Sequence, residues 1–417
     1  MTASTWDCAI VGGGAAGLSA AVFLRRLCPS APVVILEKNA RVGKKLLATG
    51  NGTCNLSNMG TQESHYHGAS PAFVRNALAA FPPEDAIRFF ASIGLSCCVR
   101  EDRRVYPLCL SAAAVLDCLR LENRACGIEE RCGVTVAAIR PQKGGFLLET
   151  DQGPLNARTV LAATGGAAAP PLGGSTAGYA LLTALGHTRT PLFPSIVQLR
   201  TDTAFVKSLK GIRVEGGIRL LLDGMPCGQE NGEILFTEYG LSGPAVMQCS
   251  RPAADWERRR RGTLAAELDL LPGISRKALG SELLRRRTLP GRTREDFLTG
   301  LCQKRVGQTL MRAAGLTPLT EPAASLSDAE LNRLADFLKG WRLTVTGTQG
   351  MGGAQVTAGG IATDECDPRT MMSRKAPGLF LAGEVLDIDG DCGGYNLQWA
   401  WASAHTAAEG IAAYLRR

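Results

Sequence analysis

The sequence predicts an α/β fold built on a parallel sheet, and three features near the N-terminus indicate it. A short apolar strand at residues 8–11 runs into a glycine-rich turn at residues 12–17. Apolar residues then follow a helical spacing from Leu18 to Leu27, and a second apolar strand ends at Glu37. Strand, glycine turn, helix and strand in this order form the β-α-β unit of a Rossmann-like domain that binds a dinucleotide.

The turn fits the motif G-x-G-x-x-G, and each glycine has a physical role. Gly12 permits the tight turn, Gly14 lets the backbone approach a pyrophosphate, and Gly17 lets the helix lie close to the strand. Ala15 and Ala16 complete the motif at the start of the helix, where free N–H groups and the positive end of the helix dipole attract phosphate.

The end of the second strand is predicted to contact the ribose. Glu37 can accept hydrogen bonds from both ribose hydroxyls, and an acid at this position argues against a ribose 2′-phosphate. Lys38 follows it directly and is a further candidate contact.

A small β-meander follows much later in the chain. Residues 133–139 predict a strand and residues 144–161 predict a hairpin, after which the chain reads Ala-Thr-Gly-Gly. A strand that ends in Ala-Thr-Gly after such a meander is typical of flavoproteins around the adenosine of FAD. FAD is therefore the expected dinucleotide, with Val136, Thr164 and Gly165 as candidate contacts.

The loop GKKLLATGNGTCNLSN at residues 43–58 is predicted to reach the flavin. Lys44, Gly52 and Asn55 are candidate contacts, although Lys44 can equally face solvent. Cys54 is a weak catalytic candidate, because a neighbouring lysine would supply the positive charge that a thiolate needs. The alternative is a small packing residue against the ring.

The C-terminal stretch GEVLDIDGDCGGYNLQWAWAS is predicted to complete the cofactor site. An apolar strand ends at Gly383, where a side chain is expected to collide with the cofactor. Asp389 is the preferred carboxylate along the ribityl and pyrophosphate path, or else it caps a turn. A helix that begins near Asn396 would aim the N–H groups of Leu397 and Gln398 at the pyrimidine edge of the flavin. The alternative is an ordinary amphipathic terminal helix.

Five stretches together resemble the BaiN/YhiN-like family of bacterial FAD-dependent oxidoreductases, also described as aminoacetone-oxidase-like. They are IVGGGAAGL (10–18), GKKLLATGNGTCNLSN (43–58), ATGG with GGSTAGYALLTALGH (163–187), GEILFTEYGLSGPA (232–245), and VTAGGI through GLFLAGEVLDIDGDCGGYNLQWAWAS (356–403). The resemblance implies reduction of conjugated C=C bonds in steroid-like molecules such as 3-oxo bile acid intermediates. Many members carry Arg at the position of Thr53 and His at the position of Glu238, so no role of those side chains transfers to this chain.

The predicted fold class is α/β: a Rossmann-like FAD-binding domain of the glutathione-reductase type, with an inserted β-rich lobe and a small helical lobe. The FAD domain is expected at residues 1–190 and 345–417, the β-rich lobe at 191–270, and the helical lobe at 271–344. Residues 343–347 are predicted to return the chain to the FAD domain. No second G-x-G-x-x-G follows the first, so no separate NAD domain is expected.

Composition indicates a globular protein with a cytoplasmic location. Hydrophobic residues make up 45% and charged residues 20% of the chain, and no apolar run is long enough for a membrane span. The 14 cysteines follow no zinc or dithiol spacing, so they are interpreted as reduced thiols, with no metal site.

The net charge of +8 is concentrated in residues 251–312, where 15 Lys and Arg stand against 7 Asp and Glu (15 − 7 = +8). The preferred interpretation is a solvated helical surface, and the alternative is a patch for RNA or a carboxylated small molecule.

The leading function is an FAD-dependent oxidoreductase that acts on a small organic substrate by hydride transfer through flavin N5, with NAD(P)H as the expected donor. The alternatives are a flavin-dependent amine oxidase that uses O2, a tRNA-binding flavoprotein, and a non-catalytic flavin redox sensor. Tyr239 and Ser242 are weak candidate proton donors that can equally form a turn and a helix start. None of the four histidines is assigned as a general base, and no oligomeric state is predicted.

Overall fold

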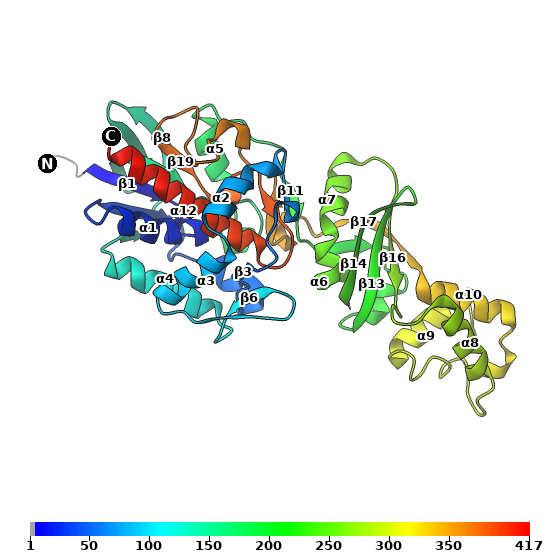
Figure 1. The fold of residues 1–417 in the computed structure, drawn as a ribbon. Coiled ribbons are helices and arrows are strands. Elements are labelled where there is room, and N and C mark those ends of the chain that lie inside the picture. Colours follow the sequence, from blue (N-terminus) through cyan, green and yellow to red (C-terminus); the bar gives the residue numbers. More distant parts are fainter. Residues whose placement is uncertain (1–4) are drawn as a thin grey trace. The chain divides into compact units, whose positions relative to one another are not determined.

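The computed structural model describes residues 5–417, which form two compact units. The first unit contains residues 5–194 together with Ala354–Arg417, and the second contains Ser195–Gly353 (Figure 1). Each unit is described by itself.

The first unit combines a mixed sheet with helices and three small β-pairings. Its strands are β1 (Thr5–Val11), β2 (Val33–Glu37), β3 (Ser57–Asn58), β4 (Tyr66–His67), β5 (Cys97–Val99), β6 (Arg104–Pro107), β7 (Glu129–Cys132), β8 (Val136–Gln142), β9 (Gly145–Thr150), β10 (Gly153–Ala162), β11 (Phe193–Ser195), β18 (Val356–Ala358), β19 (Leu379–Leu381) and β20 (Asp389–Gly390). Its helices are α1 (Ala15–Leu27), α2 (Val74–Ala80), α3 (Pro83–Ser92), α4 (Ala112–Ala125), α5 (Ala177–Thr183) and α12 (Tyr395–Leu415).

The main sheet has the order β7-β2-β1-β10-β9-β8, and β19 pairs with β10. The strands β7, β2, β1, β10 and β19 are parallel, whereas β9 and β8 form an antiparallel meander on β10. The β-α-β unit predicted from the sequence is therefore present as β1, α1 and β2, and the predicted fold class is confirmed.

The core of this unit forms where the two ends of the chain meet. The strand β2 is buried along its whole length, as expected for a strand covered on both faces of a parallel sheet. The helix α12 (red in Figure 1) lies along α1 (blue), and the side chains of Trp399 and Trp401 are fully buried. Small residues on both helices permit this close approach.

Three small β-pairings tie loops of the first unit together. They are the sheet β3-β6-β5, the pair β20-β4 and the pair β11-β18. The pair β20-β4 joins positions that are more than 300 residues apart, because Asp389 lies opposite His67.

The second unit is a closed barrel with helices around it. Its strands are β12 (Leu199–Thr201), β13 (Arg213–Leu222), β14 (Met225–Phe236), β15 (Gly240–Ser242), β16 (Leu264–Asp269) and β17 (Trp341–Thr348). Its helices are α6 (Pro244–Gln248), α7 (Ser250–Arg259), α8 (Arg276–Arg287), α9 (Lys304–Ala313), α10 (Asp328–Lys339) and α11 (Gly350–Gly353). The barrel order is β12-β15-β14-β13-β16-β17, and one hydrophobic core extends from the strands into α8, α9 and α10.

The strand β17 corrects one prediction. Residues 343–347, expected to return the chain to the first domain, instead close the barrel between β16 and β12. Leu343 and Val345 are buried while Thr344 between them is exposed. This alternation is typical of a half-buried antiparallel strand, and it fits a barrel better than a parallel sheet covered on both faces.

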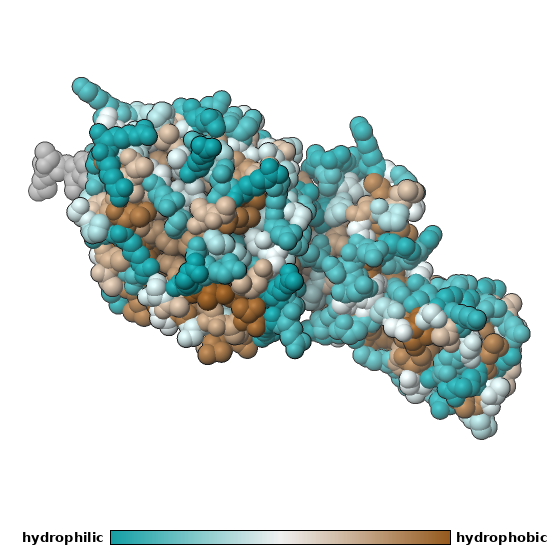
Figure 2. Space-filling view, viewed as in Figure 1, coloured by the Kyte–Doolittle hydropathy of each residue, from teal (hydrophilic) through white to brown (hydrophobic). Residues whose placement is uncertain are grey.

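Three further observations concern the helices, the thiols and the surface. In residues 5–417, no helix combines the length and the apolar character that crossing a membrane requires. All 14 cysteines are free thiols. Figure 2 shows apolar side chains gathered on one face over the region of α3 and β6, and the exposed apolar residues include Leu108 and Leu121.

Candidate functional site

The site forms at the carboxyl edge of the parallel strands. The strands β1, β10 and β19 end at Val11, Ala162 and Leu381, and irregular segments from three distant parts of the chain follow them. In open α/β sheets, ligands bind outside the carboxyl ends of the strands, where such segments meet.

The three motif glycines have separable roles. Gly12 has a φ of +110°, and a Cβ there would lie 2.3 Å from the carbonyl oxygen of Ala163. A Cβ on Gly17 would lie 2.0 Å from the carbonyl oxygen of Gly12, so this glycine is required by the contact of α1 with the turn. A Cβ on Gly14 would meet no heavy atom within 4 Å. Gly12 and Gly17 therefore serve the fold, while Gly14 faces open space.

The first turn of α1 offers free hydrogen-bond donors. Gly14 is the N-cap and supplies no side chain, and the first turn contains no acidic residue. Ala15 and Ala16 therefore present their N–H groups together with the positive end of the helix dipole, which suits a phosphate.

Glu37 is buried beside this turn and already has backbone partners. Its Oε2 accepts a hydrogen bond of 2.8 Å from the N–H of Gly13, and its Oε1 accepts one of 2.8 Å from the N–H of Asn39. The side-chain Nδ2 of Asn39 donates to the same Oε1 at 2.5 Å. A carboxylate has about four acceptor positions, so Glu37 can still accept one hydroxyl group. Lys38 is exposed next to it.

The segment after β10 contributes a polar atom without a partner. The hydroxyl of Thr164 is buried and has no hydrogen-bond partner among the described residues. A Cβ on the following Gly165 would meet no atom within 4 Å, so open space adjoins it. Val136 pairs with Thr150 in the meander, whereas the neighbouring Val134 donates its N–H to the carbonyl of Glu37 at 3.0 Å. Val134 therefore contacts the strand that ends at Glu37, although the sequence pattern did not single out this residue.

The loop that follows β2 carries the predicted candidates Cys54 and Lys44, and their surroundings differ. Cys54 is fully buried, and burial raises the pKa of its thiol to about 12, which counts against a thiolate nucleophile. Lys45 forms an ion pair of 2.7 Å with Glu384, while no described residue pairs with the partly exposed Lys44. The side chains that act on the Cys54 thiol are those of Thr49 and Cys97, and neither supplies the positive charge that the catalytic interpretation required.

The same loop also carries Gly52 and Asn55. A Cβ on Gly52 would meet no atom within 4 Å. The Oδ1 of Asn55 is buried without a hydrogen-bond partner among residues 5–417. Because an unsatisfied buried acceptor is costly, this atom is a good candidate to meet a bound group.

Gly383 is favoured by contacts that the sequence did not indicate. Its φ is +75°, and a Cβ would lie 3.1 Å from the Cβ of Ala16 in α1. Its N–H donates to Ser403 at 2.9 Å, and its carbonyl accepts from Trp399 at 3.2 Å. Its backbone conformation and its contacts within the protein already favour glycine here, and the collision of a side chain with the cofactor stays a prediction.

The start of α12 also differs in detail from the prediction. The helix begins at Tyr395, and the N–H of Gln398 donates to the carbonyl of Gly394 at 3.0 Å, so it is not free for a ligand. The N–H of Leu397 has no acceptor within the described part of the chain. The Asn396 side chain is engaged, because its Oδ1 accepts from the N–H of Gly390 at 2.8 Å.

Two histidines and an aspartate form a cluster that the sequence did not reveal. Nδ1 of His65 lies 3.1 Å from one carboxylate oxygen of Asp391, and Nε2 of His67 lies 2.7 Å from the other. The predicted carboxylate Asp389 is buried beside them, opposite His67. No local pattern indicates this cluster, because Asp391 is more than 320 positions from both histidines.

Tyr239 and Ser242 lie in the second unit. The hydroxyl of Thr237 donates to the carbonyl of Gly240 at 2.9 Å and accepts its N–H at 3.1 Å, which closes the turn that contains Tyr239. Ser242 is buried in β15, directly before the start of α6. These contacts favour the interpretation as a turn and a helix start.

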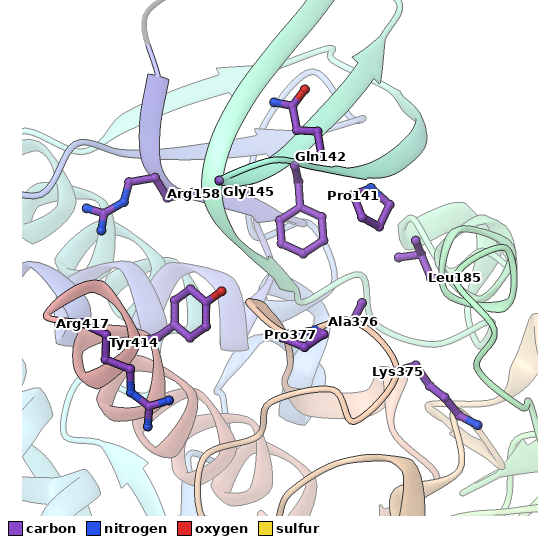
Figure 3. Close-up of a pocket in the computed structure, with 12 residues that line it drawn as sticks. Pro141, Gln142, Gly145, Arg158, Leu185, Lys375, Ala376, Pro377, Tyr414 and Arg417 are labelled. Carbon is purple, nitrogen blue, oxygen red and sulfur yellow. The ribbon is translucent and has the colours of Figure 1, made fainter.

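A pocket of about 610 Å³ lies elsewhere on the first unit (Figure 3). Its lining includes the β8–β9 turn, residues 376–377 and the basic side chains of Arg158, Lys375 and Arg417. Residues 376–377 precede β19, so the pocket lies toward the amino ends of the strands, away from the glycine turn.

The four features at the carboxyl edge fit a dinucleotide. We call Gly14, Glu37, Asn55 and Thr164 the cofactor seat. It combines open space at a helix start, a carboxylate with one free acceptor position and two buried polar atoms without partners. No described residue fills these requirements.

The chain matches known proteins along almost its whole length. A family model described as HI0933-like protein Rossmann domain matches residues 6–410. The 3-dehydro-bile acid delta(4,6)-reductase of Clostridium scindens is 38% identical over 409 residues, which cover 97% of this chain and 98% of the relative. A ribosomal RNA dihydrouridine synthase of Haemophilus influenzae is 31% identical over 410 residues, covering 96% of this chain and 97% of the relative.

A solved structure shares the fold at much lower identity. The 3-ketosteroid delta1-dehydrogenase from Sterolibacterium denitrificans superposes with a TM-score of 0.52 at 12% identity, covering 98% of this chain and 100% of that chain.

Proposed function

Because the chain belongs to the HI0933-like Rossmann-domain family, we propose that it is an FAD-dependent reductase of C=C bonds conjugated to a carbonyl group. That the protein is an FAD-dependent oxidoreductase follows from the family and from the full-length similarity to a reductase. The substrate class and the electron donor are the proposed part.

The cofactor seat supports FAD as the group that binds. The helix start at Gly14 would hold the pyrophosphate, and Glu37 would accept a ribose hydroxyl at its remaining acceptor position. The bound cofactor would in turn give a partner to the buried hydroxyl of Thr164 and to the buried Oδ1 of Asn55. When bound, FAD supplies hydride transfer at its N5 position.

Similarity to the bile acid reductase is the observation that carries the substrate class. The name of that relative describes reduction of double bonds in a 3-oxo compound, and this chain covers 98% of it at 38% identity. The proposed substrate is therefore a small organic enone of steroid type. NAD(P)H is proposed as donor without a separate binding domain, because the chain contains a single G-x-G-x-x-G.

A uracil base in RNA is the second candidate substrate. The relative named ribosomal RNA dihydrouridine synthase favours it, since dihydrouridine is uridine whose carbonyl-conjugated double bond has been saturated. Enone and uracil thus require the same chemistry, a hydride on one carbon and a proton on its neighbour.

Anaerobic reoxidation distinguishes the candidates. The flavin is first reduced with NADH or NADPH. It is then mixed with a steroid enone or with a uridine-containing ribosomal RNA fragment. A third sample is mixed with oxygen, and the product of amine oxidation is assayed. Rapid reoxidation by the enone, with a product two hydrogens heavier, is expected. Reoxidation by the RNA fragment alone would select the second candidate, and reoxidation by oxygen alone would contradict both.

A further inference from the structure

The imidazole cluster of His65, Asp391 and His67 is a built arrangement of three titratable groups. Each oxygen of the Asp391 carboxylate faces one imidazole nitrogen, at 3.1 Å for His65 and 2.7 Å for His67. The N–H of Asp391 also donates to the carbonyl of His65 at 2.9 Å, so the backbone fixes the carboxylate between the rings. The ring of His65 stacks on Tyr395, with centroids 4.3 Å apart.

The cluster lies where the loop of residues 43–58 meets the segment before α12. Asn58, from the loop that carries Asn55, donates its side-chain N–H to the carbonyl of Gly393 at 3.0 Å. A Cβ on Gly394 would lie 2.7 Å from the partnerless Oδ1 of Asn55. The segment 390–396 therefore links the cluster to the cofactor seat on one side and to the start of α12 on the other.

The cluster is also open to solvent on one side. The His65 and His67 side chains are 32% and 34% exposed, whereas the carboxylate of Asp391 is 22% exposed. A proton on either ring can thus be replaced from water, while the ring stays oriented by Asp391. Within residues 5–417, no group of three or more His, Cys, Asp or Glu side chains is arranged to hold a metal ion.

We propose that the imidazole cluster delivers the proton that saturation of the double bond requires. This inference rests on the proposed function. Reduction of a conjugated C=C bond consumes one hydride, which reduced FAD provides at the expense of NAD(P)H, and one proton. The hydride forms a C–H bond at the carbon distal to the carbonyl, and the resulting enolate takes a proton from an imidazolium at the adjacent carbon. The neutral imidazole then takes a proton from water.

The surroundings fix the charge of the carboxylate. Burial raises the pKa of Asp391, but hydrogen bonds from His67 and His65 outweigh it, so the pKa lies below its usual range. Asp391 therefore remains ionised and stabilises positive charge on the imidazoles. Tyr66 and Tyr395 lie near Asp391, Asp389 lies opposite His67, and Arg103 and Arg104 act on Tyr395.

A merely structural role is the alternative, since the same contacts also hold β4 against β20. The two roles differ in what Asp391→Asn changes. Asparagine keeps the size of the side chain but presents an N–H donor to one ring, so it cannot stabilise an imidazolium. Asp391→Asn, His65→Gln and His67→Gln are the test variants. Glu63→Gln is the matched control, because Glu63 precedes His65 by two positions yet pairs with the exposed Arg75 instead of the cluster.

Two measurements test the proposal. In the protein freed of flavin, NMR should show 15N resonances of imidazole nitrogens hydrogen-bonded to the Asp391 carboxylate, which Asp391→Asn shifts and Glu63→Gln retains. In the loaded protein, rapid-mixing kinetics separate flavin reduction by the donor from reoxidation by the enone. Asp391→Asn should leave the first step unchanged and slow the second by about 10- to 100-fold.

Each outcome has a distinct meaning. If the wild type is reoxidised by the enone and Asp391→Asn is reoxidised as fast, the cluster does not deliver the proton. Equal slowing of both half-reactions, or loss of the imidazole resonances in Glu63→Gln, would indicate a structural role and overturn the proposal. A wild type that no enone reoxidises would instead contradict the proposed function itself.

Discussion

Glu37 illustrates how far single residues could be predicted. The sequence placed it at the end of a buried strand, and the structure adds that both carboxylate oxygens already accept backbone N–H groups. The carboxylate thus fixes the glycine turn as well as offering an acceptor to a ribose. A residue at a strand end is predictable from local pattern, but its partners across the turn are not.

Glu37→Gln should weaken the fold and the cofactor seat together. The amide would point an N–H group at one of the two donors, Gly13 or Asn39, and leave that donor unsatisfied. The expected loss in the free energy of unfolding of the flavin-free protein is about 1–3 kcal/mol. Denaturant unfolding measures it, and an unchanged midpoint would show that these contacts contribute nothing.

Cys54→Ser should leave catalysis intact. Burial raises the pKa of Cys54 to about 12, so a neutral thiol is present throughout the physiological range. We expect rates of both half-reactions within about twofold of the wild type, since no thiolate is lost. As a second check, iodoacetamide at pH 8 should modify the exposed Cys109 and spare Cys54 in the native protein. Rapid labelling of Cys54 would contradict this assignment.

The imidazole cluster is a group of residues that could not be predicted from the sequence. His65 and His67 stand in an irregular segment, and only the pairing of β4 with β20 brings Asp391 between them. Gly383 is a second example, because its close contact with Ala16 depends on how α1 lies against the sheet.

At the scale of elements, local pattern predicted the β-α-β unit but not the barrel. The segments β1, α1 and β2 follow one another directly in the chain. The spacing of their apolar residues is therefore enough to predict a strand, a helix and a strand in that order. The barrel strand β17 pairs with β16 and β12, which are distant in the chain, so residues 343–347 carried no signal of their partners.

His187 connects the end of α5 to the segment before β19. Its side chain is buried, with Nδ1 3.0 Å from Glu365 and Nε2 2.8 Å from the hydroxyl of Ser373. Burial lowers the pKa of His187, although the hydrogen bond with Glu365 opposes this. The folded protein therefore keeps this imidazole neutral at a pH where the unfolded chain is protonated.

Stability should consequently fall on the acid side of the usual histidine pKa. Above about pH 6.5 the contribution of His187 is fully present, and below it the unfolded state binds the extra proton. The limiting slope for one such group is about 1.4 kcal/mol per pH unit. His187→Gln should be less stable at pH 8 yet show a shallower loss between pH 6.5 and 5. An identical slope in both proteins, measured by denaturant unfolding, would exclude this residue as the source.

At the scale of the whole molecule, the two ends of the chain build one unit, and a barrel with helices is inserted between them. The insert carries the excess positive charge, but many of its arginines have acidic partners. Glu282 pairs with Arg285 and Arg286, Asp328 pairs with Arg287, and Asp255 pairs with Arg258 and Arg259. This pairing supports the interpretation as a solvated surface.

Enone reduction should therefore be independent of RNA. Adding a ribosomal RNA fragment should change the reoxidation rate less than about twofold, and filter binding should show a shallow dependence on salt, because many arginines of the insert already have acidic partners. A steep decline of log affinity with log salt, together with reoxidation by the fragment, would favour the uracil substrate.

The flavin affinity of Gly14→Ala is the most direct test of the cofactor seat, on which the redox chemistry depends. A Cβ at Gly14 meets no protein atom within 4 Å, whereas a Cβ at Gly17 would lie 2.0 Å from the carbonyl of Gly12. Gly17→Ala is therefore the control that should fail to fold. Gly14→Ala should unfold like the wild type while its dissociation constant for FAD, measured by fluorescence titration of the flavin-free protein, rises at least about tenfold. Wild-type affinity in Gly14→Ala would contradict the proposed seat.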